Sequence, residues 1–130
     1  MNTKEALDLL RVDNNYRVLE RLQEKKVYNE GDPISPKLGV YVDVETTGLD
    51  SENDEIIEIA LVPFIFTSDG KLYHCLEPIN MLQEPTDGVV PEEITNLTGI
   101  TSEDVKGHSI DWLAIKECIN SAAIIIAHNA

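Results

Sequence analysis

The spacing of hydrophobic residues changes part-way along the chain. In the first part, apolar residues recur at helical intervals, at Leu7 and Leu10 and again over residues 18–22, and this period indicates amphipathic helices. We therefore expect two successive helices. The segment 29–36 contains a glycine and two prolines, which end helices. Residues 1–37 are predicted to form a helical N-terminal extension and linker, packed on the domain that follows.

The second part, residues 38–130, reads as a domain built on strands. Apolar and β-branched runs indicate buried strands, and we expect four of them, at 38–45, 54–66, 71–77 and 122–127. Pro63 indicates a bulge or an edge in the second strand, because proline cannot donate a hydrogen bond to a neighbouring strand.

A loop over residues 78–90 and three helices are expected before the last strand. Pro91, followed by two acids, favours a helix start, and Gly99 lies where that helix would end. Thr101 is typical of a second start, and residues 109–120 have an amphipathic helical pattern. Strands, helices and a final buried strand together predict an α/β fold, with a mixed sheet and flanking helices.

Net charge is concentrated in the second part. The chain has 130 residues and a formal charge of −14. Residues 1–37 hold seven bases and seven acids, whereas residues 38–130 hold three bases and seventeen acids. Because basic surfaces bind nucleic-acid backbones, this balance argues against tight binding of long duplexes by this chain alone.

The remaining composition points to a cytoplasmic protein without a membrane span. No run approaches the ~18 apolar residues that a spanning helix needs, and the first residues lack the apolar stretch of a secretory signal. Cys75 and Cys118 lie far apart in the sequence, and we interpret them as reduced thiols.

The segment Asp43-Val44-Glu45-Thr46-Thr47-Gly48-Leu49 carries the candidate chemistry. Side chains alternate along a strand, so Asp43 and Glu45 point to one face, about 6.5–7 Å apart. Two neighbouring carboxylates repel each other, and a pair of divalent cations about 3.5–4 Å apart, as used to hydrolyse phosphodiesters, would remove the conflict. A second Asp-x-Glu pair, Asp50-Ser51-Glu52, lies in a polar loop, where we expect no role for it.

This seven-residue run resembles the first motif of the DEDD 3′–5′ exonucleases. Within that superfamily it is most similar to the DEDDh branch that holds the epsilon proofreading subunit of bacterial DNA polymerase III and ribonuclease T. The resemblance covers residues 38–130 and implies a ribonuclease H-like fold. It also implies that Pro91–Thr101 lies beside the active site, and that Ile126–Ala130 begins the second motif.

The resemblance implies a metal-dependent exonuclease that releases nucleoside monophosphates from 3′ ends of single-stranded DNA or RNA. Asp43 and Glu45 would be the catalytic residues and would hold two Mg²⁺ or Mn²⁺ ions. Threonine hydroxyls would contact the terminal sugar and phosphate, the glycine would let the backbone approach closely, and the leucine would stack on the terminal base. The substrate-binding residues implied are Thr46, Thr47, Gly48, Leu49, His128 and Asn129.

The chain departs from the family pattern at its end. In the family, the second motif continues to a further aspartate, and a third motif supplies a histidine and a fourth aspartate. The sequence stops at Ala130, so we expect a fold that is incomplete at the C-terminus, with two of four carboxylates and weak or no activity. We also expect the last strand to be an exposed edge that favours a homodimer.

The alternative is a non-catalytic module of the same fold that binds protein or nucleic acid. It would use the exposed strand or the N-terminal bases Arg17, Arg21, Lys25 and Lys26. A polymerase or another protein is a possible partner for either the exonuclease or the non-catalytic module. The choice between DNA and RNA, and between proofreading, repair and end maturation, stays open.

Overall fold

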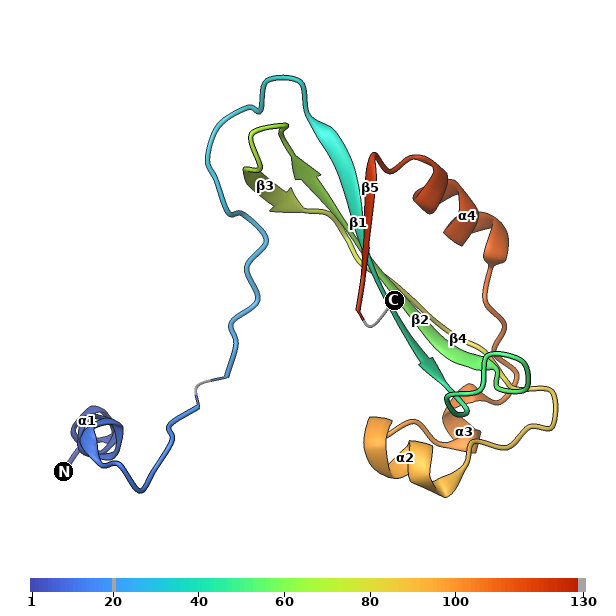
Figure 1. The fold of residues 1–130 in the computed structure, drawn as a ribbon, viewed down its shortest axis with the longest axis horizontal. Helices are drawn as coiled ribbons and strands as arrows, with labels where there is room; N and C mark the ends of the chain where they lie inside the picture. The colour runs from blue at the N-terminus through green and yellow to red at the C-terminus, as the bar shows by residue number, and fades with distance from the viewer. Residues whose placement is uncertain (20, 129–130) are drawn as a thin grey trace.

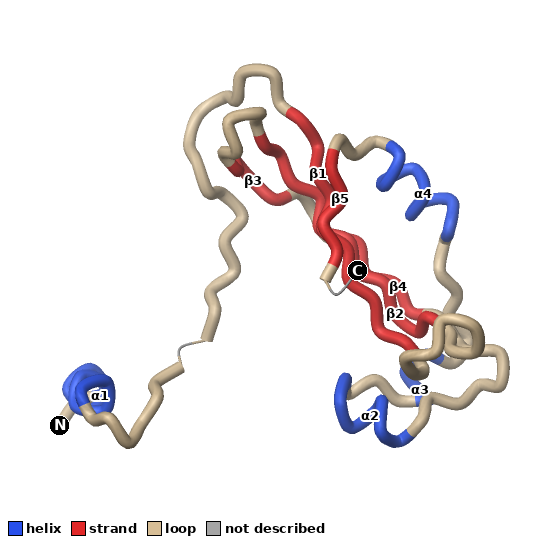
Figure 2. The backbone as a smooth tube through the Cα atoms, in the orientation of Figure 1, coloured by secondary structure: helices blue, strands red, loops and turns tan. Residues whose placement is uncertain are grey.

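A computed structural model describes residues 1–19 and 21–128, and its centre is one five-stranded sheet (Figures 1 and 2). The strands are β1 (Lys37–Thr46), β2 (Ile56–Phe66), β3 (Leu72–Cys75), β4 (Ile79–Leu82) and β5 (Ile124–Ala127). The helices are α1 (Thr3–Val12), α2 (Glu92–Thr98), α3 (Ser102–Val105) and α4 (Trp112–Asn120).

The sheet is mixed, as the sequence predicts. Its order is β3-β2-β1-β5, and β4 also pairs with β2. Strand β1 runs antiparallel to β2 and parallel to β5, whereas β3 and β4 are both antiparallel to β2. Strand β1 therefore has a neighbour on each side, which fixes the direction of its side chains.

One face of the sheet carries the core. The main cluster joins Val40, Ile59 and Leu61 of the sheet to Ile110 and Ile115 of the α4 region. A second cluster joins Ile57 to residues of the α2–α3 region, namely Val90 and Val105, with Ile94 and Ile100 packed against them. Ile57, Ile59 and Leu61 alternate along β2 and so share this face.

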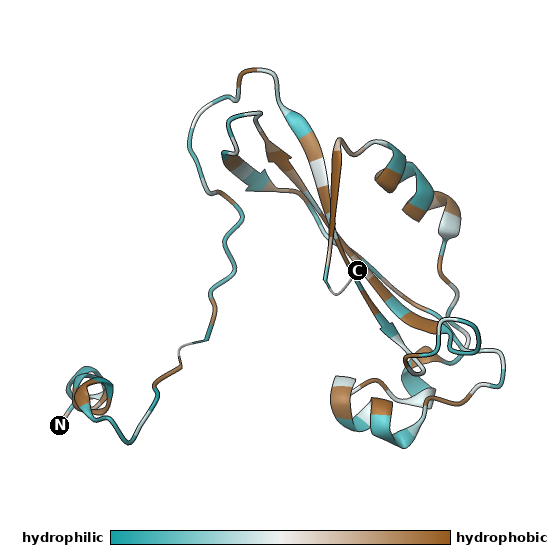
Figure 3. Cartoon of the chain, in the orientation of Figure 1, coloured by the Kyte–Doolittle hydropathy of each residue, from teal (hydrophilic) through white to brown (hydrophobic). Residues whose placement is uncertain are grey.

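The buried apolar residues hold the helices against the sheet. Burying one such side chain contributes about 1.5–3 kcal/mol, and Val40, Ile57, Leu61 and Val105 have no exposed surface. Strands β2 and β5 are coloured mostly as hydrophobic in Figure 3. In the described part of the chain, no helix is long and apolar enough to cross a membrane.

Strand β4 corrects the expectation of a plain loop over 78–90. Asn80 interrupts the apolar run there, so the local pattern is weak, but the long β2 has free edge positions beside residues 58–61. Pro63 lies between the part of β2 that pairs with β4 and the part that pairs with β3. Its carbonyl accepts a hydrogen bond from the Leu76 amide at 2.8 Å, so the proline lies where the partner strand changes.

The N-terminal segment differs from the prediction. Helix α1 is present and begins with a capping box between Asn2 and Glu5. However, none of its residues is buried, and Figure 1 shows it away from the sheet. The expectation of a helix packed on the domain is therefore wrong for α1.

The prediction of a second helix is also wrong, because the described residues between 13 and 30 are not helical. Instead, Val27 forms an isolated antiparallel bridge with His74. The Cys75 amide donates to the Lys26 carbonyl at 2.9 Å, and the Tyr28 amide donates to the Tyr73 carbonyl at 2.7 Å. The edge of β3 offers unpaired backbone groups, and hydrogen bonds to them outweigh a weak local helical preference.

Candidate active site

A cleft of about 530 Å³ lies at the end of β1. Its wall combines the strand end, the loop after it, one side of α2 and the residue that follows β5. The lining residues are Asp43, Val44, Glu45, Thr46, Gly48, Leu49, Ile94, Leu97, Thr98 and His128. The fold therefore brings together most of the residues that the sequence predicts for the site.

Asp43 and Glu45 lie on the face of the sheet opposite the core. Their cross-strand partners on β2 are Ala60 and Glu58, and directly opposed residues point to the same side. Asp43 is exposed and Glu45 is half-buried. Within the described residues, neither carboxylate has a hydrogen bond or an ion pair, so both are free to bind a ligand in the cleft.

A β-bulge directly follows the two carboxylates. Glu45 pairs with Glu58 but Thr46 pairs with Ile56, so Ile57 is the extra residue on β2. Bulges re-aim side chains and end strand pairing, and they are frequent beside active sites. The buried side chain of Ile57 anchors the bulge, and the chain then leaves the sheet as a loop.

Thr47 and Gly48 serve the structure of this loop. The Thr47 hydroxyl donates to Asp54 Oδ1 and accepts from the Glu55 amide, both at 2.9 Å. A Cβ atom on Gly48 would lie 2.3 Å from Asp54 Oδ2, and that oxygen is held by the Asp50 amide at 2.8 Å. Thr47 is not among the residues that line the cleft, unlike Thr46 and Gly48.

The second Asp-x-Glu pair has a structural role that the sequence reading did not assign. The Asp50 carboxylate accepts from the Asn53 side-chain amide at 2.7 Å and from the Glu52 backbone amide at 3.0 Å. The hydrogen bond from Asn53 has the larger effect, and together these hydrogen bonds lower the pKa of Asp50. An Asp followed two and three residues later by such donors is typical of a turn, and this signal could have been read from the sequence.

Two leucines form the exposed apolar rim of the cleft. Leu49 comes from the loop and Leu97 from α2, and their exposed fractions are 103% and 81%. Helix α2 lies across the cleft because its Ile94 packs against the second core cluster. The sequence pointed to the segment around α2, but it did not single out Ile94, Leu97 or Thr98, since contact across the cleft is a tertiary property.

The ligand chemistry of the cleft fits a hard divalent cation. His128 is exposed and lines the cleft, whereas Asn129 lies outside the described residues. In the described part of the chain, no three His, Cys, Asp or Glu side chains converge as a metal site. Mg²⁺ commonly binds through one or two carboxylates and keeps several waters, and Asp43 and Glu45 supply that number.

Comparison with known proteins gives the geometry a family context. The model of the family described as exonuclease (RNase_T) matches residues 40–130. The chain is 36% identical over 94 residues to a PolC-type DNA polymerase III from Clostridium perfringens, covering 70% of this chain and 6% of that protein. It is 31% identical over 105 residues to ribonuclease T from Vibrio vulnificus, covering 70% of this chain and 48% of that protein. The chain thus spans less than half the length of these relatives.

Solved structures share the fold. E. coli exonuclease I, in complex with a 5cy-dA13 oligonucleotide, is 20% identical with a TM-score of 0.52 over 72% of this chain and 21% of that one. A moderately thermophilic exonuclease I from Methylocaldum szegediense is also 20% identical, with a TM-score of 0.55 over 72% of this chain and 20% of that one. The mixed sheet with flanking helices is therefore the fold that the sequence resemblance implied.

Proposed function

This chain belongs to the exonuclease family of the RNase T type, within the DEDD 3′–5′ exonuclease superfamily, and we propose that its cleft binds the 3′ end of a nucleic acid and contributes to hydrolysis of the terminal phosphodiester. The observation that carries the proposal is the position of Asp43 and Glu45. They share one face of a strand that pairs with β2 at both positions and with β5 just before them, up to Val42, and both line a cleft beside an apolar rim.

Asp43 and Glu45 would hold Mg²⁺ or Mn²⁺. A divalent ion bound there would supply a nucleophilic water at neutral pH and stabilise the charge on the leaving oxygen. The chain's own part is to fix the two carboxylates at a constant separation, because β1 cannot shift without breaking its pairing to β2 and β5. The loop that follows the bulge supplies Gly48 and Leu49 to the wall of the cleft.

The rim of the cleft would hold the terminal nucleotide. Leu49 and Leu97 are exposed on either side, and apolar side chains can pack against the faces of a base. The Thr46 hydroxyl donates to the Gly48 carbonyl, and Thr46 also lines the cleft. We propose Thr46, Gly48 and His128 as contacts to the terminal sugar and phosphate. Thr47 and Asn129 remain proposed contacts from the resemblance alone.

Single-stranded 3′ ends of DNA or RNA are the proposed substrates. The seventeen acids among residues 38–130 oppose binding of a long nucleic-acid backbone, so recognition would depend on the terminal nucleotide and the cation. A polymerase-containing assembly is a proposed partner, since one relative is a PolC-type DNA polymerase III.

The test is Mn²⁺-dependent shortening of a 5′-labelled single-stranded oligonucleotide, comparing the protein with Asp43→Asn. We expect stepwise loss from the 3′ end that the substitution abolishes. A product ladder that persists in Asp43→Asn would contradict the assignment of the cleft. Running DNA and RNA oligonucleotides of the same sequence side by side identifies the polymer.

A non-catalytic interaction module is the second candidate, and one observation favours it. Strand β5 pairs with β1 on one side, has no described partner on the other, and carries Ile124, Ile125 and Ile126 at 42–49% exposure. Such an edge invites pairing with another strand, and a homodimer through it is proposed. Sedimentation of the protein and of Ile125→Lys tests this, because a charge on the edge should shift a dimer to monomer.

A further inference from the structure

A third carboxylate lies on the strand next to Asp43 and Glu45, on the same face of the sheet. Glu58 on β2 is the direct cross-strand partner of Glu45, and Cβ atoms of such partners are about 4.5–5.5 Å apart on the same face of the sheet. Asp43 lies two residues before Glu45, so three acids occupy one small area of the sheet. The sequence reading gave Glu58 no role.

Glu58 is an unusual residue for its position. It is the single charged residue of β2, and it is half-buried. On its other side it faces Leu82 of β4, so neither neighbouring strand presents a counter-charge. Its carboxylate has no hydrogen bond or ion pair within the described residues.

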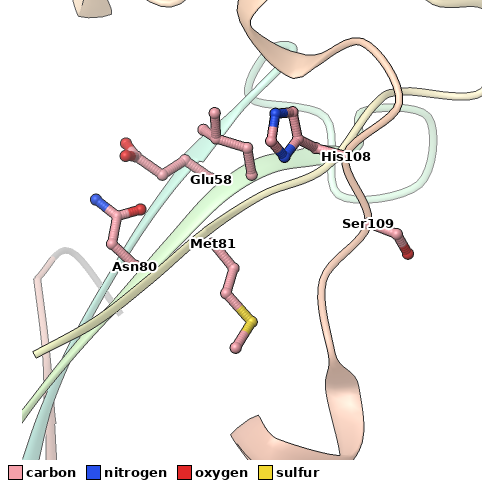
Figure 4. Close-up of a pocket in the computed structure, with 6 residues that line it drawn as sticks. Glu58, Asn80, Met81, His108 and Ser109 are labelled. Atoms are coloured by element: carbon pink, nitrogen blue, oxygen red, sulfur yellow. The ribbon is translucent and has the colours of Figure 1, made fainter.

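Figure 4 shows where the side chain lies. Glu58 lines a pocket of about 430 Å³ with Asn80, Met81, His108 and Ser109. The Glu58 and Asn80 side chains point to the same side of their strands, whereas Met81 points to the other. Glu58 does not line the cleft of Asp43 and Glu45, so any influence that it has on a ligand there is through its charge and not through direct contact.

Like charges directly opposite on paired strands destabilise a sheet. A cation at Asp43 and Glu45 would turn this unfavourable pair into a favourable arrangement. We propose that Glu58 is a positioning residue that strengthens divalent-cation binding at Asp43 and Glu45 at the expense of the stability of the metal-free protein. This inference rests on the proposed function.

The experiment measures Mn²⁺ binding by electron paramagnetic resonance of the free ion, and thermal unfolding without metal. Both are run at the same pH. Removing one nearby unit charge changes the affinity for a divalent ion about three- to tenfold in a water-like dielectric, so Glu58→Gln should weaken Mn²⁺ binding by that factor. The same substitution should raise the unfolding temperature of the metal-free protein by about 1–4 °C.

Two controls make the test specific. Glu117→Gln removes the same charge from an exposed position on α4, which packs on the opposite face, and should change neither quantity. Glu58→Asp keeps the charge and should keep the affinity. A purely structural role for Glu58 would lower stability and affinity together, instead of moving them in opposite directions.

The outcomes separate this inference from the proposed function. Mn²⁺ binding that is abolished by Asp43→Asn but unchanged by Glu58→Gln would overturn the role of Glu58 alone. A wild-type protein that binds no Mn²⁺ would overturn the proposed function and this inference with it. Weaker Mn²⁺ binding in Glu58→Gln together with a lower unfolding temperature would also overturn the inference. That result would show that Glu58 does not destabilise the metal-free protein by repelling Glu45.

Discussion

The two Asp-x-Glu pairs of this chain have the same sequence pattern but differ in secondary structure and in the hydrogen bonds of their aspartates. Asp43 and Glu45 lie on a strand and pair with residues of β2, and their carboxylates have no partner in the described part of the chain. Asp50 lies seven residues later in a loop, and its carboxylate accepts hydrogen bonds from Glu52 and Asn53.

The difference comes from where the backbone donors are. In a strand, side chains project from the faces of the sheet and away from the backbone amides, and pairing with β2 holds Asp43 and Glu45 in that arrangement. In a loop, the amides are free and a short acidic side chain satisfies them. The pattern is therefore informative about ligand binding only in combination with its secondary structure.

The largest contrast between the two pairs is expected from removing one charge at a time. Asp43→Asn should abolish Mn²⁺ binding and reduce 3′-end shortening by at least about 100-fold, because a bound ion contributes several kcal/mol to the transition state. Asp50→Asn should keep both. Equal losses in the two variants would show that the effect is on folding, which circular dichroism would reveal.

Gly48→Ala tests whether the loop must keep its shape for the cleft to form. The new Cβ would lie 2.3 Å from Asp54 Oδ2, and that carboxylate is held by Thr47 and Asp50. We expect a loss of about 1–3 kcal/mol in the free energy of unfolding, measured in urea, together with reduced shortening. Ser51→Ala, in the same loop, is the control, and a neutral Gly48→Ala would contradict the close contact.

Thr47→Val separates a structural role from substrate contact. The variant loses a hydroxyl that makes two hydrogen bonds, each contributing about 1 kcal/mol. The free energy of unfolding should fall by about 1–2 kcal/mol, and Thr47→Ser should restore it. Loss of shortening without loss of stability would instead support the substrate contact that the family resemblance implies.

The smallest effect concerns the pH dependence that Asp50 adds to stability. In the folded protein, the hydrogen bond from the Asn53 side chain holds the pKa of Asp50 below its ordinary value. Its contribution to stability is therefore present above the unfolded pKa and is lost as pH falls through the folded pKa. The difference in unfolding temperature between wild type and Asp50→Asn should be positive at pH 7 and shrink below about pH 3.8. A constant difference would show that Asn53 and Glu52 do not favour the ionised form.

Prediction from the sequence succeeded where a local signal was strong. The apolar runs of β1 and β2, the capping signal at Thr101 and the glycine at the end of α2 all correspond to elements of the structure. It failed where a long-range partner decided the outcome. Residues 26–29 lie against β3 instead of forming a helix, and β4 forms because β2 extends past β3.

The sequence by itself determined that Asp43 and Glu45 would share one face of a strand, because alternation of side chains follows from the backbone alone. Only the tertiary structure decided what surrounds them. Cross-strand register put Glu58 opposite Glu45, packing of Ile94 put α2 across the cleft, and a hydrogen bond to Asp54 engaged the hydroxyl of Thr47. Such contacts join residues that are distant in the chain, and their energies depend on register and packing that no local pattern encodes.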